Sequence, residues 1–352
     1  MISIEKTFQT DFHYDLSRIG APDRLLFFDI ETTGLSAYNS GLYLIGAVTA
    51  DPEGFRLRQW FCESLSDEQQ VLRAFFDFAK NYDTLVSFNG ETFDIRFIET
   101  LASQYHIKSP LQSMQSFDIL KRLRAKRALL PLPNFRQKSV EQFLGIGRDD
   151  RFSGGELISV YEEYTRTHDQ EAKHFLLLHN EEDIKGMPAI LPALSYGDAL
   201  CSGFEVVDSG KSKDGRDLFA TLQFPFSFPR PLDYDAAGGI RLHFESSRID
   251  VTIRLLVDEL KFFYPDYKNY WYLTEEDYAI HKKLASFVDR AYRVPATAAT
   301  CYTRMQGSFL PALRGADLPV FRSEYRGTPA YHLLEERPGF LESYLSALLR
   351  EI

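Results

Sequence analysis

A short apolar run that ends in two acidic residues constrains the fold of this chain more than any other feature. The run is Leu25–Ile30, with the sequence LLFFDI, and Glu31 follows it directly. Pro22 and Gly34 flank the run, so its length and its borders predict a buried β-strand. Side chains alternate between the two faces of a strand, so Asp29 and Glu31 point the same way. The sequence therefore predicts two carboxylates side by side on a buried strand.

Two neighbouring carboxylates at a buried position repel each other and are costly to remove from water. A divalent cation is the usual means of neutralising such a pair. Because the ligands would all be oxygen atoms, hard cations such as Mg²⁺ or Mn²⁺ are favoured. The alternative is a pair of acids at a strand end that faces solvent, and the fragment by itself leaves that alternative open.

The first half of the chain has the pattern of an α/β domain. A turn of sequence DPEG separates two apolar runs, which predicts a hairpin. Strands are expected at 25–30, 42–49, 55–62, 85–88 and near 116–120, and helices at 66–79, 93–105, 139–144, 157–165 and 171–194. The last helix is expected to kink or break near Gly186 and Pro188. We therefore expect a mixed five-stranded sheet flanked by helices over residues 1–199.

Residues 200–352 are richer in aromatic residues and in strand patterns, which predicts a second, accessory domain of α+β type. A Pro-Asp turn between two aromatic runs favours a hairpin within 259–273. Thr274 is a suitable N-cap for a helix that runs to about Tyr292, and a last helix is expected over 339–351. The tyrosines and the tryptophan between 264 and 272 are either a stacking platform for single-stranded nucleic acid or a small core, and the core is favoured.

The composition bears on the location of the chain. The three cysteines Cys62, Cys201 and Cys301 are far apart in the sequence, which fits a reducing compartment and argues against a disulfide framework or a zinc site. The N-terminus lacks the pattern of a secretory signal, and no apolar run approaches the roughly 18 residues of a membrane span. We therefore expect a cytoplasmic protein that does not contact a membrane.

The formal net charge of −10 argues against attraction of nucleic acid to the surface as a whole. One segment differs, because it has seven basic residues and no acidic residue between Ile119 and Lys138. Such a segment is able to follow a phosphate backbone, and Phe135 within it is available for stacking. The alternative is a solvated helix face followed by a loop.

Two later segments place further acids in predicted helices. Asp94 ends the segment SFNGETFD at 87–94 and falls in the first turn of a helix, where an acid also complements the helix dipole. Asp183 lies in HNEEDI at 179–184, and a spacing of four residues places His179 on the same helix face. Each feature alone has a simple explanation, but their order along the chain makes the combination much more specific.

That order is an Asp-x-Glu strand, an Asp after the fourth strand and a helical Asp preceded by a basic residue. In this order residues 20–195 resemble the DEDD (DnaQ-like) superfamily of 3′→5′ exonucleases, which has the ribonuclease H-like fold. Within it, the chain looks most similar to the YprB-type branch. The segments that carry this similarity are FDIETTGL (28–35), LYLIG (42–46), SFNGETFD (87–94), SFD (116–118), KSVEQFLGI (138–146), SGGE (153–156) and HNEEDI (179–184).

The resemblance implies a nuclease that hydrolyses phosphodiester bonds in single-stranded DNA or RNA with two divalent cations, Mg²⁺ or Mn²⁺. It implies four metal ligands, Asp29, Glu31, Asp94 and Asp183, and gives His179 the task of orienting or deprotonating the attacking water. The terminal nucleotide is expected to contact Thr32, Thr33 and Asn89. Lys138 is the expected substrate contact of the basic segment. Asp118 is expected either beside the metal ligands or as a cap of a helix or strand.

The position of His179 departs from the better-known members of the superfamily. The tyrosine type has its Tyr four residues before the last Asp, and the histidine type has its His five residues before it. Here the histidine has the spacing of the tyrosine type, which changes the helix phase by about 100°. The role of His179 as a base therefore stays open. For the chain as a whole, the alternative is a catalytically weak nucleic-acid-binding or scaffolding module on the same fold.

Overall fold

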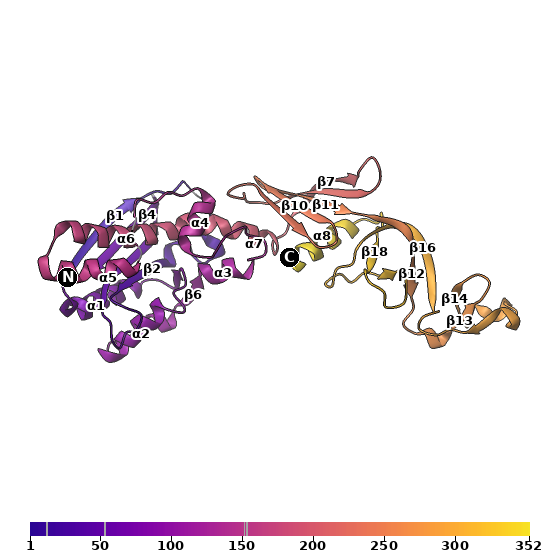
Figure 1. Cartoon of the computed structure of the whole chain (residues 1–352), viewed down its shortest axis with the longest axis horizontal. Coiled ribbons are helices and arrows are strands. Elements are labelled where there is room, and N and C mark those ends of the chain that lie inside the picture. The colour runs from indigo at the N-terminus through magenta and orange to yellow at the C-terminus, as the bar shows by residue number, and fades with distance from the viewer. Residues whose placement is uncertain (12, 53, 151, 153) are drawn as a thin grey trace. The chain divides into compact units, whose positions relative to one another are not determined.

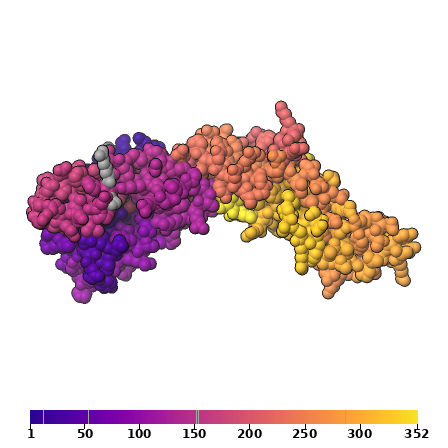
Figure 2. Space-filling view, viewed as in Figure 1, coloured from indigo at the N-terminus to yellow at the C-terminus, as the bar shows by residue number. Residues whose placement is uncertain are grey.

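A computed structural model describes residues 1–352 apart from positions 12, 53, 151 and 153. The chain divides into two compact units, Met1–Gly197 and Asp198–Ile352. The first unit runs from indigo to magenta in Figures 1 and 2, and the second runs from rose to yellow. The expected motif SGGE begins at Ser153, which lies outside the described residues.

The first unit contains a mixed sheet with six strands in its described part, in the order β1-β4-β3-β2-β5-β6. The pairs β1–β4, β4–β3 and β3–β2 are antiparallel, and β5 and β6 run parallel to β2. The strands are β1 (Ile2–Phe8), β2 (Leu25–Thr32), β3 (Leu42–Asp51), β4 (Gly54–Phe61), β5 (Thr84–Ser87) and β6 (Gln115–Asp118). The expected mixed α/β sheet and the hairpin between β3 and β4 are confirmed.

The strand that the sequence analysis missed is β1, so the sheet has six strands where five were expected. Ile2–Phe8 pairs with β4 along its whole length, from Ile2 opposite Phe61 to Phe8 opposite Phe55. Its sequence is polar because it is an edge strand, and only the apolar residues Ile2 and Ile4 alternate with polar ones before Glu5. That pattern is too short to predict a strand by itself.

Seven α-helices of the described residues surround this sheet or follow it. They are α1 (Glu68–Ala79), α2 (Asp94–Gln104), α3 (Ile119–Ala125), α4 (Gln137–Leu144), α5 (Gly154–Thr167), α6 (Gln170–Ile190) and the short α7 (Ser195–Ala199). Of the kink or break expected near Gly186 and Pro188, the break does not occur, because α6 continues through both residues and ends at Ile190. A Cβ added at Gly186 would lie 2.2 Å from Glu141 Oε1. The glycine therefore lets α4 approach α6 closely.

The central strand β2 is buried on both of its faces. Leu25, Leu26, Phe27 and Phe28 have no exposed surface, and burial of each such side chain contributes about 1.5–3 kcal/mol. The ring of Phe28 stacks on Phe75 of α1 with centroids 5.7 Å apart. Asp29, one residue further, points to the opposite face, where α6 packs against β2, β3 and β4. The sheet is therefore covered by α1 on one face and by α6 on the other (Figure 1).

The second unit consists mainly of antiparallel β-structure. It has a sheet of order β7-β8-β11-β10-β9, a closed barrel of order β12-β16-β18-β17 and a sheet of order β14-β13-β15. The turn after β7 projects from the surface of this unit (Figure 2). The elements are β7 (Glu205–Lys211), β8 (Asp217–Gln223), β9 (Leu232–Ala236), β10 (Ile240–Glu245), β11 (Arg248–Arg254), β12 (Leu256–Phe263), β13 (Tyr270–Leu273), β14 (Tyr278–His281), β15 (Arg293–Pro295), β16 (Tyr302–Pro311), β17 (Phe321–Arg322), β18 (Tyr331–Leu333) and α8 (Phe340–Glu351).

Two expectations for this unit are wrong, while the last helix is confirmed as α8. The hairpin expected within 259–273 does not form, because β12 pairs with β16 and β13 pairs with β14 and β15. The helix expected from Thr274 to Tyr292 is replaced by a hairpin turn and β14. Asp277 has a left-handed backbone with φ of 54°, and its carboxylate accepts a hydrogen bond of 2.5 Å from the Tyr272 hydroxyl. These contacts turn the chain back where a helix would continue.

Among the described residues, no helix combines the length and the apolar character needed to cross a lipid bilayer.

Candidate active site

The end of β2 carries the two carboxylates that the sequence predicted on one face. Glu31 is 8% exposed. Burial raises the pKa of Asp29 well above the usual range of a carboxyl group, and the charges of Asp94, Glu31 and Asp183 add to this. Burial also raises the pKa of Glu31, followed by the charges of Asp183 and Asp94. The carboxylates of three separate segments therefore lie close enough to disfavour ionisation of one another.

Asp94 joins this pair from the first turn of α2. Its Oδ1 accepts a hydrogen bond of 3.2 Å from the backbone N–H of Ile30, the residue between Asp29 and Glu31. Asp94 is 6% exposed, and burial raises the pKa of its carboxyl group to about 7 although backbone N–H groups donate to it. The structure thus holds Asp94 against β2 by a bond to the strand backbone.

Asp118 shapes the turn that precedes Asp94. It is the N-cap of α3, where its carboxylate accepts from the N–H of Lys121 at 3.2 Å. It also accepts from the backbone of Asn89 at 3.1 Å and of Glu91 at 3.3 Å. Asp118 therefore has the capping position that was one of its two expected roles, and it fixes the turn that leads into α2.

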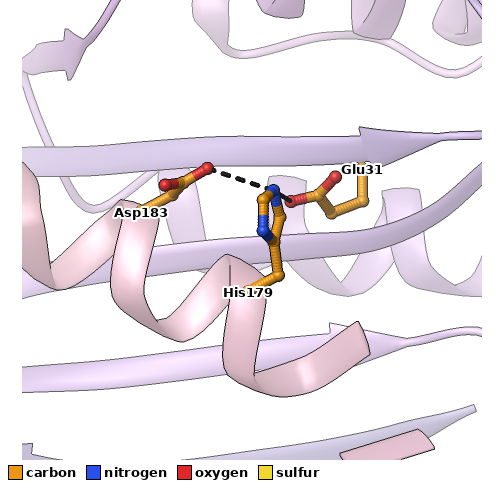
Figure 3. A group of neighbouring side chains, drawn as sticks. All are labelled: Glu31, His179 and Asp183. Atoms are coloured by element: carbon orange, nitrogen blue, oxygen red, sulfur yellow. Dashed lines mark ion pairs between the residues drawn. The ribbon is translucent and has the colours of Figure 1, made fainter. Parts of the chain in front are cut away.

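Helix α6 supplies His179 and Asp183 to the same place. The imidazole Nε2 of His179 lies 3.4 Å from Oδ2 of Asp183 and 3.8 Å from Oε1 of Glu31. Figure 3 shows the ring between the two carboxylates, with Glu31 reaching it from the strand. The four-residue spacing on α6 thus directs the side chain of His179 towards the carboxylates of the site. One ligand atom from each of these three residues lies within 4.8 Å of the others.

This donor set fits a divalent cation. The carboxylates of Glu31 and Asp94 are buried, that of Asp29 is partly buried, and burial and neighbouring carboxylates disfavour the charged form of each. A hard cation offsets that repulsion through oxygen ligands. The charge of Asp183 contributes to the same repulsion. One protein cation is also present, since the guanidinium of Arg148 pairs with Oδ1 of Asp183.

Three residues that sequence reasoning missed hold Asp29 in place. The Nδ2 of Asn180 donates to Asp29 Oδ2 at 3.1 Å, and its Oδ1 accepts from Gln59 Nε2 at 3.0 Å. Asp29, Gly46 and Gln59 are neighbours across β2, β3 and β4. A Cβ at Gly46 would lie 2.2 Å from Asn180 Oδ1. The glycine of LYLIG and the asparagine of HNEEDI are thus one packing unit, which the separate motifs did not reveal.

A second group missed by sequence reasoning lies on the segment between α4 and α5. Oδ2 of Asp150 lies 2.8 Å from Nδ1 of His179, on the ring edge opposite the other carboxylates. Burial opposes ionisation of Asp150, but hydrogen bonds from the Phe152 N–H and from His179 outweigh it and lower the pKa of this carboxyl group. The contact between Asp150 and His179 depends on the path of the segment between α4 and α5, and local sequence patterns do not predict that path.

The four residues expected to bind substrate make local contacts in the structure. The Thr32 hydroxyl donates to the Gly34 carbonyl at 2.7 Å, and the Thr33 hydroxyl accepts from the Gly41 N–H at 2.9 Å. Asn89 has a left-handed backbone with φ of 70°, and its side-chain oxygen accepts from Thr92 at 2.8 Å. Lys138 Nζ donates to Asp150 Oδ2 at 3.1 Å and to the Phe152 carbonyl at 3.0 Å. Substrate contacts of these residues stay a prediction.

The two other predicted nucleic-acid surfaces differ in their surroundings. In the basic segment, Lys121 pairs with Glu91 at 2.8 Å, while Arg124, Arg127 and Arg136 are exposed. In the second unit, several of the aromatic residues pack on a small core of Ala279, Ala296 and Cys301, as the favoured alternative predicted; these are Tyr264, Tyr267, Tyr270 and Tyr272.

Comparison with known proteins identifies the fold of this region. Residues 26–195 match the model of the RNase_H superfamily. The matched range includes β2 to β6 and α1 to α6, and with them all the acidic residues of the site. The first unit therefore contains a ribonuclease H-like domain, and the match supports a nuclease at the level of the superfamily. No curated protein sequence matches the chain.

Solved structures share parts of the fold at low identity. The family B DNA polymerase of the archaeon Pyrobaculum calidifontis is 14% identical with a TM-score of 0.42, over 64% of this chain and 40% of that one. Exonuclease I of E. coli in complex with a dT13 oligonucleotide is 16% identical with a TM-score of 0.33, over 57% of this chain and 52% of that one. The overlap thus spans about half or less of these longer proteins.

Proposed function

We propose that this chain is a metal-dependent nuclease that hydrolyses phosphodiester bonds. The observation that carries this proposal is the convergence of four carboxylates from β2, α2 and α6, three of them with raised pKa values. A structural role explains such a cluster poorly, because mutual repulsion without a cation makes it costly. The superfamily match over residues 26–195 supports the same chemistry.

In the proposed reaction, Asp29, Glu31, Asp94 and Asp183 would hold two divalent cations, Mg²⁺ or Mn²⁺. The chemistry that such cations would supply is polarisation of the phosphate, activation of water and stabilisation of the leaving oxygen. His179 orients the attacking water and accepts its proton at Nε2, the nitrogen that lies between Glu31 and Asp183. Asn180 keeps the Asp29 carboxylate in one orientation through its 3.1 Å hydrogen bond.

The finer parts of the proposal concern direction and substrate. We propose 3′→5′ exonuclease action on single-stranded DNA or RNA, with membership of the DEDD superfamily and its YprB-type branch, on the similarity of the sequence motifs. The exposed Arg124, Arg127 and Arg136 are available to follow the phosphate backbone. Thr32, Thr33, Asn89 and Lys138 are the proposed substrate contacts. A cytoplasmic location is supported by the three free thiols.

One observation favours the second candidate, a nucleic-acid-binding module with weak catalysis. The Arg148 guanidinium already pairs with Asp183 and lies 3.2 Å from Glu141 and 3.5 Å from Glu182. A cation that uses Asp183 must compete with this pairing. An ion pair between Arg148 and Asp183 that persists in the presence of metal would keep the site inactive. Cleavage therefore distinguishes the two candidates.

The test uses 5′-labelled single-stranded DNA and RNA with Mg²⁺ or Mn²⁺. We expect a ladder of products that shortens from the 3′ end, and a loss of at least about 10²-fold in rate for Asp183→Asn because a ligand of the reacting centre is removed. Asp77→Asn on the exposed face of α1 is the matched control and should cleave at the wild-type rate. Absence of cleavage by the wild type, or equal rates for Asp183→Asn, contradicts the nuclease.

A further inference from the structure

The segment between α4 and α5 is bound to α6 by carboxylates of the helix. Glu182 accepts hydrogen bonds from two successive backbone N–H groups, those of Asp149 and Asp150, each at 2.8 Å. Arg148 of the same segment pairs with Asp183 one residue further along α6. A carboxylate that receives two adjacent N–H groups fixes the direction of the peptide between them. Glu182 thus determines where the side chain of Asp150 points.

That side chain points away from solvent and towards the imidazole of His179. The Asp150 side chain is 2% exposed, and its Oδ2 lies 2.8 Å from Nδ1 of His179. Lys138 Nζ reaches the same oxygen at 3.1 Å, and the Phe152 N–H donates to Oδ1 at 3.0 Å. Both oxygens of Asp150 therefore act as acceptors. An acceptor at this distance requires the hydrogen on Nδ1 of His179.

The ring nitrogen that carries the hydrogen decides whether the other nitrogen is able to accept a proton. With its hydrogen on Nδ1, a neutral imidazole has an unprotonated Nε2. This is the nitrogen that lies 3.4 Å from Asp183 and 3.8 Å from Glu31. An imidazole in the other tautomer would present an N–H here and would be unable to accept a proton. A carboxylate behind a catalytic imidazole sets this choice in other hydrolases.

We propose that Asp150 is a positioning residue for His179, which fixes the ring orientation and the Nδ1–H tautomer so that Nε2 accepts the proton of the attacking water. The proposal rests on the nuclease function above. As the water oxygen bonds to phosphorus and the bond to the leaving oxygen breaks, the water proton passes to Nε2 and the leaving oxygen takes a proton from solvent. Lys138 supports Asp150, and Glu182 supports the backbone that carries it.

The first test reads the tautomer without any need for cleavage. Long-range ¹⁵N NMR of the full chain distinguishes the two nitrogens of each histidine, and His179→Gln identifies the signals of His179. At a pH where no imidazolium signal remains, we expect the hydrogen of His179 on Nδ1. In Asp150→Asn the Nε2–H tautomer should gain population, while Asp149→Asn, an exposed neighbour in the same segment, should match the wild type. If the neutral His179 of the wild type carries its hydrogen on Nε2, the proposal is overturned. This outcome does not depend on whether the variant folds.

The second test uses steady-state cleavage of a labelled single strand. Asp150→Asn should lower kcat by about 10- to 100-fold, the usual cost of removing a carboxylate behind a functional histidine, with KM little changed. His179→Ala should cost about 10²–10⁴-fold if His179 is the base. In the His179→Ala background, Asp150→Asn should cost nothing further. A further loss there shows that Asp150 acts on something other than His179 and overturns the proposal.

The two tests separate this inference from the function on which it rests. A chain that has the Asp150-dependent tautomer but cleaves neither DNA nor RNA contradicts the nuclease, while the pairing of Asp150 with His179 stands. If Asp150→Asn cleaves as fast as the active wild type, only the positioning role is contradicted.

Discussion

At the scale of single residues, the geometry of the site depends on side chains that have no chemical role in the proposed reaction. Asn180 is fully buried and joins Asp29 of β2 to Gln59 of β4, across a glycine on the strand between them. The amide occupies the space that any side chain at position 46 would take. The absence of a side chain at Gly46 therefore allows Asn180 to orient the Asp29 carboxylate.

This packing predicts the effect of Gly46→Ala. The added Cβ would lie 2.2 Å from Asn180 Oδ1, so the amide must move and its bond to Asp29 is lost. Overpacking of this kind costs about 1–3 kcal/mol, which denaturant unfolding should show as a lower free energy of unfolding. Gly155→Ala is the control, since a Cβ there meets nothing within 4 Å and alanine favours a helix. Equal stability of Gly46→Ala and the wild type would show that Asn180 is not held in this position.

The sequence predicted some of these residues and not others, for a physical reason. Asp29 and Glu31 follow from strand geometry, and His179 and Asp183 follow from helix geometry, so local spacing was sufficient for both pairs. The contacts of Asp150, Asn180 and Gly46 join segments that are far apart along the chain. Local periodicity carries no information about such contacts.

At the scale of elements, α6 organises the site on two sides. Its residues 179, 180 and 183 face the sheet and the acidic cluster, while Glu182 binds the segment between α4 and α5. Sequence reasoning placed this helix correctly but expected a kink or break near Gly186 and Pro188, where the helix is unbroken. The close approach of α4, which Gly186 permits, is a tertiary contact that outweighs the low helix propensity of glycine and proline.

The role of α6 as an anchor predicts the effect of Glu182→Ala. Loss of the acceptor leaves the N–H groups of Asp149 and Asp150 without their partner on α6, so backbone amides in this segment should exchange with deuterium faster. Glu171→Ala, on the exposed first turn of the same helix, should leave this exchange unchanged. Cleavage by Glu182→Ala should fall in parallel with that by Asp150→Asn. Unchanged exchange at positions 149 and 150 would rule out the anchor.

At the scale of the whole molecule, the described residues form two units with separate cores. The large core of the first unit contains β2 to β4 with α1, α2 and α5, and smaller clusters lie in the barrel and in the β13 sheet of the second. The sequence predicted a change of character near residue 200 because composition shifts there. It failed on the strand pairing of the second unit, since β12 and β16 are joined by 38 intervening residues.

The two cores predict separate melting transitions with different responses to metal and pH. Because the folded-state pKa values of Asp29, Glu31 and Asp94 are raised, the metal-free folded protein holds protons that the unfolded chain releases. The contribution of these groups to stability is therefore present at low pH and is lost as pH rises from about 4 to 7 or above. Saturating Mn²⁺ reverses the loss, and a cation at 100 times its Kd adds about 2.7 kcal/mol.

Scanning calorimetry of the full chain checks this prediction. In chelator, the first-unit transition should move to lower temperature between pH 5 and pH 8, and Mn²⁺ at pH 8 should raise it by roughly 5–10 °C. The second-unit transition should not respond to Mn²⁺. Asp94→Asn should weaken both responses because it removes one of the raised carboxyl groups and one ligand. Equal shifts of both transitions would contradict a site confined to the first unit.

The span of the site along the chain has a consequence for its synthesis. Asp29 emerges from the ribosome 154 residues before Asp183, an interval of roughly 10–30 s at common elongation rates. During that time the growing chain contains β2 and α2 but neither His179 nor the fourth carboxylate. Asp29 also lacks the amide of Asn180 until α6 is complete. The proposed site is therefore incomplete in the nascent polypeptide until α6 has been translated.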